Sequence, residues 1–373
     1  MKWQCADKKK IKTVWNFSLS KIAGDVDQWL HQTFNPTWAL VAEMVIVGVG
    51  VIGLFAALGL VLVLMERRVA AWIQIRLGPN RVGPKGLLQS LADTVKLLVK
   101  EGMTPGGADK FLFNLAPFIA MIVAMLLMAP IVFAKDFVIW DMNIGVLYVS
   151  AISSLSVIGI LMAGWASNNK YSLMGAMRSG AQIVSYELSA GLSVLTIVIL
   201  TGSLNLTDII NSQQNGWWIF KGHIPVIIAF VIFIIAVTAE TNRAPFDLAE
   251  AESELTAGFH TEYSGMKFAL FFLAEYINVF IVCAIGATIF LGGWMPFHIG
   301  NWNSFNHVMD YIPSSIWFFG KTFFLIFVIM WFRWTFPRLR IDQLLNLEWK
   351  YLLPISMFNI LLATAMAILG WHF

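Results

Sequence analysis

An acid-rich segment between residues 240 and 262 carries the side chains best suited to chemistry. It holds six of the chain's 22 acids: Glu240, Asp247, Glu250, Glu252, Glu254 and Glu262. Carboxyl groups this close titrate as a coupled set, so a charge change at one end of the row shifts proton occupancy along it. The segment is a candidate proton path, and a solvated acidic surface is the alternative.

A local helix would order these acids. Proline favours the first position of a helix, so we expect Pro245 to open one. On that helix Asp247, Glu250 and Glu254 share one face. Their repulsion has a local cost, and a pair between Arg243 and Asp247, four residues apart, offsets part of it.

Two further acids lie inside apolar segments, Glu187 and Glu275. An ionised carboxylate in hydrocarbon costs several kcal/mol, so such residues normally face a bundle interior or a water-filled path. Small residues near Glu187, among them Gly180 and Gly191, permit close helix packing. We expect both acids to carry or sense protons; a neutral carboxyl hydrogen-bonded to a neighbouring helix is the alternative.

A second charged segment, residues 66 to 110, is rich in arginine. It contains Glu66, Arg67, Arg68, Arg76 and Arg81, and its glycines and prolines between residues 76 and 84 break any helix. Beyond them, apolar residues at 87, 91, 95 and 98 share one helical face and polar ones at 89, 93, 96 and 100 the other. This pattern predicts an amphipathic helix at a membrane interface, with no further role as the alternative.

The elements that position these segments are membrane spans. The 373 residues are 58% hydrophobic and 13% charged, roughly half of the charge of a soluble domain, which excludes a soluble enzyme. A span needs about 20 apolar residues. Seven stretches without charge meet this need: 44–65, 111–134, 142–169, 188–207, 222–239, 276–309 and 351–373. An eighth, about 314–336, contains Lys321 and Arg333 near its ends, where long cations can snorkel to the interface. We therefore predict an all-α, polytopic membrane protein with eight transmembrane helices and the amphipathic interfacial helix.

Basic residues orient the spans. The loops at about 66–110, 166–181, 240–267 and 333–350 hold 16 Lys and Arg, whereas the alternate loops hold three. The positive-inside rule places the four basic loops in the cytoplasm and both termini outside. Residues 1–38 form an N-terminal extension, expected to lie on the surface, before the eight-helix domain of residues 39–373.

Other chemistry is not indicated. Cys5 and Cys283 fit neither a disulfide framework nor a metal site, and the six histidines show no ligand spacing. His260, near the acidic segment, is expected to be an ordinary loop residue.

Several motifs together resemble a known family. They are the run from Glu66 to Pro84, Ala92-Asp93 with Lys96-Leu97, the run from Glu240 to Leu255, Thr261 to Lys267, and Arg333 to Leu344 with Trp349-Lys350. These resemble the NADH dehydrogenase subunit 1 family, which in bacteria is the H subunit of NADH-quinone oxidoreductase, part of respiratory complex I. The resemblance covers about residue 39 to the C-terminus. Ile341 replaces the family's usual aromatic residue.

The resemblance implies a subunit in the bacterial inner membrane, where the peripheral redox arm meets the membrane arm. Its partners would be peripheral quinone-module subunits and small and antiporter-like membrane subunits. The chain would bind no cofactor, since flavin (FMN) and iron–sulfur clusters belong to partner subunits, and quinone would be a substrate. Chamber residues would be Glu66, Arg67, Arg68, Arg76, Arg81 and Arg243. The acid chain would comprise Glu187, Asp247, Glu250, Glu252, Glu254 and Glu262, to which burial in a span adds Glu275.

Two other classes of protein remain as alternatives. One is the homologous component of a related energy-converting complex, such as a membrane-bound hydrogenase or a non-NADH quinone reductase. The other is a free-standing eight-helix transporter, which would be expected to bind substrate on broken helices at the midplane rather than gather its charge in loops.

Overall fold

Eight long apolar helices dominate the computed structural model, which describes residues 28–29, 32–33, 35–135, 137–214, 216–249, 252–298 and 303–370. Among these residues, eight helices are long and apolar enough to cross a membrane. They are α2 (Pro36–Ile73), α4 (Lys110–Leu127), α5 (Gly145–Ala166), α6 (Lys170–Thr201), α9 (His223–Glu240), α11 (Gly265–Phe290), α13 (Ser314–Thr335) and a last segment, Ile341–Ile368. The predicted fold class is confirmed.

The chain divides into two compact units, residues 1–56 and 57–373, and each is described by itself. The first contains the beginning of α2, where proline at the first position loses no intrahelical hydrogen bond. Most of the predicted N-terminal extension, residues 1–38, lies outside the described residues. The second unit contains the remaining helices and all the contacts discussed below.

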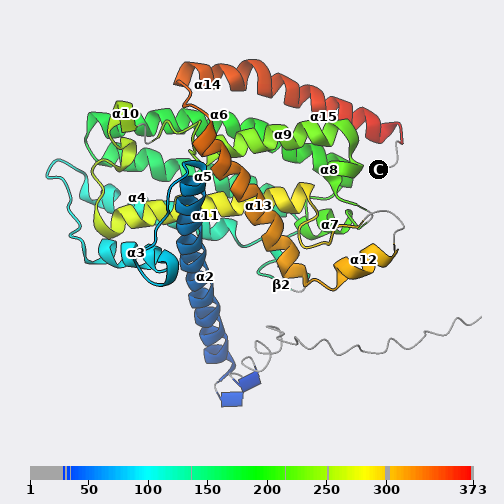
Figure 1. The fold of residues 1–373 in the computed structure, drawn as a ribbon, viewed down its shortest axis with the longest axis horizontal. Helices are drawn as coiled ribbons and strands as arrows, with labels where there is room; N and C mark the ends of the chain where they lie inside the picture. Colours follow the sequence, from blue (N-terminus) through cyan, green and yellow to red (C-terminus); the bar gives the residue numbers. More distant parts are fainter. Residues whose placement is uncertain are drawn as a thin grey trace, which may run out of the picture. The chain divides into compact units, whose positions relative to one another are not determined.

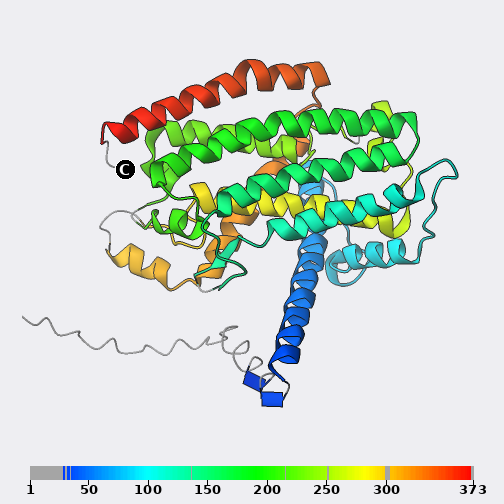
Figure 2. The same cartoon turned by 180° about the vertical axis from the view of Figure 1, so that it is seen from behind.

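Within the second unit, shorter elements gather at opposite ends of the helices (Figures 1 and 2). One end carries η1 (Pro84–Gly86), α3 (Gln89–Val99), α10 (Glu252–Leu255) and η2 (Gly258–His260). The other carries a hairpin of β1 (Val132–Ala134) and β2 (Phe137–Val138), with α7 (Leu206–Asn211), α8 (Trp218–Lys221) and α12 (Asn303–Asp310). The arginine-rich and acid-rich loops therefore share one end.

The last apolar segment is a composite helix that packs along α6 and α9 (Figures 1 and 2). It consists of α14 (Ile341–Leu347), a π-helical turn, η3 (Glu348–Leu352), and α15 (Leu353–Ile368). Helix α13 packs against α11, and α11 against α4.

Several predicted loop boundaries are wrong. Residues 66–68 belong to the last turns of α2, and α6 begins at Lys170, so most of the predicted loop 166–181 is helical. The Asn169 side chain caps α6 by accepting a hydrogen bond from the Tyr171 amide at 2.9 Å. A strip of small residues, including Gly175 and Ser179, buries this polar start of α6 against the loop before α11. Tertiary packing thus makes a helix where the charge pattern indicated a connector.

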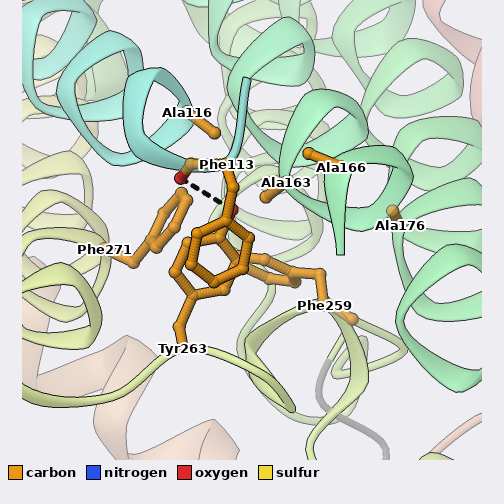
Figure 3. Packing of buried hydrophobic residues seen from close by; sticks show 9 residues of the cluster. Phe113, Ala116, Ala163, Ala166, Ala176, Phe259, Tyr263 and Phe271 are labelled. Atoms are coloured by element: carbon orange, nitrogen blue, oxygen red, sulfur yellow. Dashed lines mark hydrogen bonds between the residues drawn. The ribbon is translucent and has the colours of Figure 1, made fainter. Parts of the chain in front are cut away.

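An apolar cluster packs that loop against four helices, α4, α5, α6 and α11 (Figure 3). It comprises Phe113, Ala116, Ala163, Ala166, Ala176, Ala249, Phe259, Tyr263 and Phe271. The Tyr263 ring stacks on Phe113 with centroids 4.1 Å apart, and its hydroxyl donates to the Phe113 carbonyl oxygen at 3.2 Å. Burying one such ring contributes about 1.5 to 3 kcal/mol. Small residues let the elements approach, because a Cβ at Gly175 would lie 2.8 Å from the Gly258 Cα atom.

Helix α3 has the two faces that the sequence predicts. Its apolar side chains, among them Leu91 and Val95, are half exposed, whereas Asp93 on the other face accepts hydrogen bonds from Arg67 and from Gln89, the latter at 3.1 Å. The Arg67–Asp93 ion pair ties α3 to the end of α2. An apolar face left open beside membrane spans fits an interfacial helix, and this placement stays a prediction.

Tryptophan substitution tests that placement. We expect a tryptophan in Leu91→Trp to be quenched by brominated lipid, because the open face of α3 would meet acyl chains. Lys96→Trp, on the polar face of the same helix, is the matched control and should be quenched far less. Equal quenching at both positions would contradict the interfacial placement. The measurement is tryptophan fluorescence of the purified complex in bilayers, compared between each variant and the unsubstituted complex.

Candidate functional site

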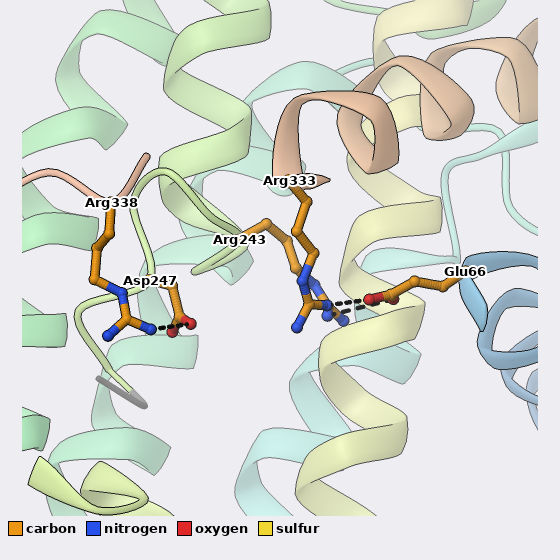
Figure 4. A network of polar contacts seen from close by, with 5 residues as sticks. All are labelled: Glu66, Arg243, Asp247, Arg333 and Arg338. Carbon is orange, nitrogen blue, oxygen red and sulfur yellow. Dashed lines mark hydrogen bonds and ion pairs between the residues drawn. The ribbon is translucent and has the colours of Figure 1, made fainter. Parts of the chain in front are cut away.

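A buried carboxylate joins three helices and a loop at the end that carries the charged segments (Figure 4). Glu66 on α2 pairs with Arg333 on α13 and lies 3.6 Å from the Arg243 guanidinium. Glu66 and Arg243 are only 7% and 6% exposed. The Arg243 guanidinium also lies over the Tyr276 ring of α11, 4.3 Å from its centroid. We call Glu66, Arg243, Arg333 and Tyr276 the polar junction.

Buried charges need such partners, since an unpaired one costs several kcal/mol. The junction brings Glu66 and Arg243 together, and their place in a quinone chamber stays a prediction. The predicted pairing of Arg243 with Asp247 is wrong, because Arg243 pairs with Glu66. Arg333 was expected to snorkel to the membrane interface, and it turns instead toward the junction. Its place in the Arg333 to Leu344 motif was the available signal.

Asp247 pairs with a different arginine (Figure 4). The Arg338 guanidinium donates to Asp247 Oδ2 at 3.0 Å, and Asp247 is 8% exposed. The two residues are 91 positions apart in the chain, so local spacing could not identify the pair.

The helix expected to begin at Pro245 does not form. A cis peptide bond joins Ala244 to Pro245, and residues 241–249 form turns and bends. The Pro245 carbonyl oxygen accepts a hydrogen bond from the Leu339 amide at 3.0 Å. The Gln182 amide on α6 donates to the Ala239 and Phe246 carbonyl oxygens, both at 2.7 Å, and lies 3.2 Å from Asn242 Oδ1.

Gln182, although far away in the sequence, therefore holds the backbone of the acid-rich loop in place. It is 1% exposed, and Ser179, one turn earlier, also donates to Asn242, at 3.2 Å. Buried backbone groups must find partners, and these side chains supply them in place of helical hydrogen bonds. This role was not predicted, and its signal in the sequence is a lone glutamine in an otherwise small and apolar helix face.

The remaining acids of the loop are distributed around it. Glu254, which is half exposed, pairs with Arg178 at 2.6 Å. Glu262 accepts a hydrogen bond from the side-chain amide of Asn169 at 2.6 Å. Glu250 lies outside the described residues, as does the side chain of Glu252. The predicted shared face of Asp247, Glu250 and Glu254 depended on the helix that does not form.

Glu187 and Glu275 lie inside helices α6 and α11, as predicted. Ser153 and Ser154 of α5 donate hydrogen bonds to Glu187, the former at 3.4 Å. Glu187 lines a mostly apolar cavity of about 230 Å³ between α5, α6, α9 and α11. Glu275 lines a smaller cavity of about 40 Å³ together with Asn278 and Ser156.

Glu240 connects these two cavities. It is the last residue of α9 and lines both of them, so one carboxyl group borders the cavity of Glu187 and that of Glu275. The sequence places Glu240 among the acids of the loop, and its contact with both cavities was not predicted. Its position at the end of an apolar span was the available signal.

No contact that the structure describes brings an arginine of the first loop into the polar junction. Arg67 pairs with Asp93, and Arg68 donates to the Lys85 carbonyl oxygen at 2.8 Å. Arg76 and Arg81 are exposed, and Arg76 donates to the nearby Gln74 side chain at 2.6 Å. Of the predicted chamber residues, Glu66 and Arg243 thus share one site, and the others surround α3 and its connecting loop.

His260 is buried, which was not predicted for a loop residue. It is 5% exposed, its ring contacts Phe259 and Phe271, and its Nε2 atom lies 3.9 Å from Glu275 Oε1. Burial lowers the pKa of His260 to about 3, because desolvation disfavours the charged ring. His260 is therefore neutral near pH 7.

Removing Arg338 tests the Asp247 ion pair. Arg338→Met leaves the buried Asp247 carboxylate without its cation and should destabilise the chain by about 3 kcal/mol. Asp247→Asn in the same chain should recover much of the loss, because the neutral amide needs no cation. Arg340→Met, at an exposed neighbouring position, is the control. The measurement is the melting temperature of this chain within the purified complex. It is read from the temperature at which limited proteolysis begins to release peptides of this chain. Equal losses with and without Asp247→Asn would contradict the pairing.

The neutral state of His260 predicts a pH dependence. The unfolded chain binds a proton at this ring below pH 6.5 and the folded chain does not, so stability falls as pH falls. Between pH 7 and pH 5 the loss is about 2 kcal/mol. His260→Phe keeps the aromatic contacts and removes this titration, so its melting temperature should change less between pH 7 and pH 5. An unchanged pH dependence would show that another group causes it.

Comparison with known proteins agrees with the motifs. A family model described as NADH dehydrogenase matches residues 44–364. The H subunit of the NADH-quinone oxidoreductase of Bacteroides fragilis is 57% identical over 352 residues, which cover 93% of this chain and 98% of the relative. The protein of the same name from Carboxydothermus hydrogenoformans is 49% identical over 334 residues, 89% of this chain and 91% of the relative. That from Rickettsia rickettsii is 52% identical over 304 residues, 81% of this chain and 87% of the relative. The chain therefore belongs to the NADH dehydrogenase family and, with its eight apolar helices, is a multi-pass membrane protein of the kind that forms the H subunit of bacterial NADH-quinone oxidoreductases.

Proposed function

We propose that this chain helps to form the quinone chamber of a proton-translocating complex I in the bacterial inner membrane, and that its carboxyl groups couple quinone reduction by NADH to proton transfer. The observation that carries this proposal is the position of Glu240, which borders the cavity of Glu187 and that of Glu275. Carboxyl groups in such a series exchange protons at short range and titrate together.

The chamber end of the proposal rests on the polar junction. A quinone needs polar groups at its head and an apolar channel for its tail. The junction supplies guanidinium and carboxyl groups, and apolar side chains flank it, among them Leu62, Val279 and Met330. Arg67 pairs with Asp93 of α3, and Arg68 binds the backbone of the first loop at Lys85. Arg76 and Arg81 lie further along that loop. The open apolar face of α3 offers the tail a path from the lipid.

The coupling step follows from charge. Reducing a quinone to a quinol adds two electrons and two protons, so negative charge develops at the head before the protons arrive. That negative charge would attract the Arg243 and Arg333 guanidinium groups and so weaken their ion pairs with Glu66. A change of charge at the junction would then shift proton occupancy at Asp247 and the other loop acids, Glu250, Glu252, Glu254 and Glu262. Through Glu240 it would reach Glu275 and Glu187.

The electrons come from partner subunits in this proposal. An iron–sulfur cluster requires about four cysteine ligands, and Cys5 and Cys283 cannot supply them. The chain alone would hold no complete active site. Its partners would be the peripheral subunits that deliver electrons and the small and antiporter-like membrane subunits that receive the protons, with both termini on the outer side.

Charge-neutral substitutions test the acid series. We expect Glu240→Gln and Glu187→Gln to lower quinone-linked proton pumping by about 10-fold or more, because an amide cannot pass a proton on. Glu250→Gln should have the same effect if the loop acids belong to the path. Asp208→Asn, an exposed position at the other end of the bundle, is the control and should pump normally.

The measurement is proton uptake and NADH–quinone activity in membrane vesicles. NADH oxidation with an artificial acceptor that bypasses the quinone shows that the complex still assembles. Normal pumping in both Glu240→Gln and Glu187→Gln would remove the proposed coupling, since no other described carboxyl group lines both cavities.

A further inference from the structure

Lys321 on α13 is buried inside a membrane-spanning helix, and the proposed function does not use it. The side chain was expected to snorkel to the interface, and that prediction is wrong because Lys321 is 6% exposed. Its Nζ atom donates to the carbonyl oxygens of Leu291 at 2.6 Å, Gly293 at 3.0 Å and Met295 at 2.6 Å. Three backbone oxygens from the segment after α11 therefore converge on one nitrogen.

These carbonyls lie at and just beyond the C-terminal end of α11, where the last backbone oxygens of the helix need hydrogen-bond donors. The Ala287 carbonyl accepts from the Leu291 and Gly293 amides, at 3.1 and 2.9 Å. The Gln213 side chain donates to the Thr288 and Ile289 carbonyls, at 3.0 and 3.2 Å. A helix end away from water needs such partners. Lys321 supplies the hydrogen-bond donors for three further carbonyls, those of Leu291, Gly293 and Met295.

Backbone geometry builds this arrangement. Gly292 and Gly293 have φ angles of 75° and 50°, in the left-handed region that glycine adopts without strain. A Cβ atom at Gly292 would lie 2.9 Å from the Trp217 ring, so a side chain there would collide with the wall of the site. Glycine at this position thus allows the chain to turn its carbonyls toward one point.

Aromatic rings close the site. The Lys321 nitrogen lies 4.2 Å from the centroid of the Trp217 ring and 5.8 Å from that of Trp317. Trp217 is itself held by Phe297, with centroids 4.8 Å apart. The negative face of an indole ring attracts a cation, most strongly where water is excluded.

The number of acceptors fits the charged form of the Lys321 side chain. An ammonium group has three N–H donors, whereas a neutral amine has two. The three carbonyl acceptors within 3.0 Å of Nζ match the three donors of the ammonium form. Within the part of the chain that the structure describes, no carboxylate pairs with Lys321. Carbonyl dipoles at the negative end of α11 and the indole rings compensate the charge.

We propose that the Leu291, Gly293 and Met295 carbonyls and the Trp217 and Trp317 rings form a binding site for a primary ammonium cation. In the unaltered chain the side chain of Lys321 fills it and locks α13 to the end of α11. Arg333, twelve residues later on α13, reaches the polar junction about 18 Å along the same helix axis. Two cationic anchors thus set the position of α13. The site does not depend on the proposed function.

Truncation and rescue test the site. Lys321→Ala in the assembled complex removes the ammonium and leaves the carbonyls without donors, so the chain's melting temperature should fall by several degrees. Methylammonium chloride should restore it in proportion to the logarithm of its concentration, as a ligand specific for the folded state does. Tetramethylammonium chloride at the same concentrations should not, because that cation donates no N–H. Sodium chloride should restore it less, because a bare cation cannot form the three directed N–H bonds of the site.

Two variants are controls. Lys321→Met fills the site with an apolar chain, so it should be destabilised and should not respond to methylammonium. Lys221→Ala removes a lysine near the same end of the bundle, which lies over the Trp218 ring at 5.3 Å and has no carbonyl cage in the described structure. It should show no rescue. A Lys321→Ala melting temperature that is unchanged, or equally raised by all three salts, would overturn the proposal.

A measurement on the unaltered complex covers the case in which Lys321→Ala fails to assemble. An ammonium group with all three hydrogens bonded should resist acetylation by a membrane-permeant amine reagent. We expect Lys321 to react about tenfold or more slowly in the folded complex than after denaturation, read by mass spectrometry of its peptide. Equal rates before and after denaturation would overturn the proposal.

Discussion

The free-energy cost of holding a charged side chain away from water governs where the ions of this chain lie. Each buried charge described above has found compensation, and in each case the partner comes from another element. Glu66 lies between Arg243 and Arg333, Asp247 meets Arg338, and Lys321 meets carbonyl oxygens. These contacts therefore link helices. Because lipid gives apolar helices little reason to prefer one another, such polar contacts and close packing of small residues select the arrangement.

The acid-rich loop shows how this constraint serves a site. A loop of carboxyl groups would repel itself in any local helix. Here Gln182 of α6 binds its backbone, Tyr263 stacks on Phe113, and single acids are assigned to separate partners. The loop is thereby held at the ends of several helices, next to Glu240. The proposed proton path would need this kind of support, because transfer between carboxyl groups depends on short and stable separations.

Parts of this architecture were predictable from the sequence because they depend on composition over short stretches. Seven charge-free runs and an eighth apolar run with two cations identified eight spans, and Glu187 and Glu275 fell inside helices as expected. The helix at Pro245 and the loop at 166–181 were wrong for one reason: distant groups overrode local preference. The Leu339 amide and the Gln182 side chain donate hydrogen bonds to carbonyl oxygens of the segment around Pro245, so these carbonyls form no local helix. Packing against the loop before α11 extends α6 back to Lys170.

The sequence by itself determined that the chain crosses a membrane, how often it does so, and which family its motifs match, since transfer of apolar segments into lipid is a local property. Only the tertiary structure decided which charge meets which. Arg338 and Asp247 are 91 residues apart and Arg333 and Glu66 are 267 apart, so no spacing rule could pair them. It also showed that Glu240 borders two cavities and that Lys321 turns inward. A buried charge takes the partner that folding brings within reach, and that depends on the whole chain.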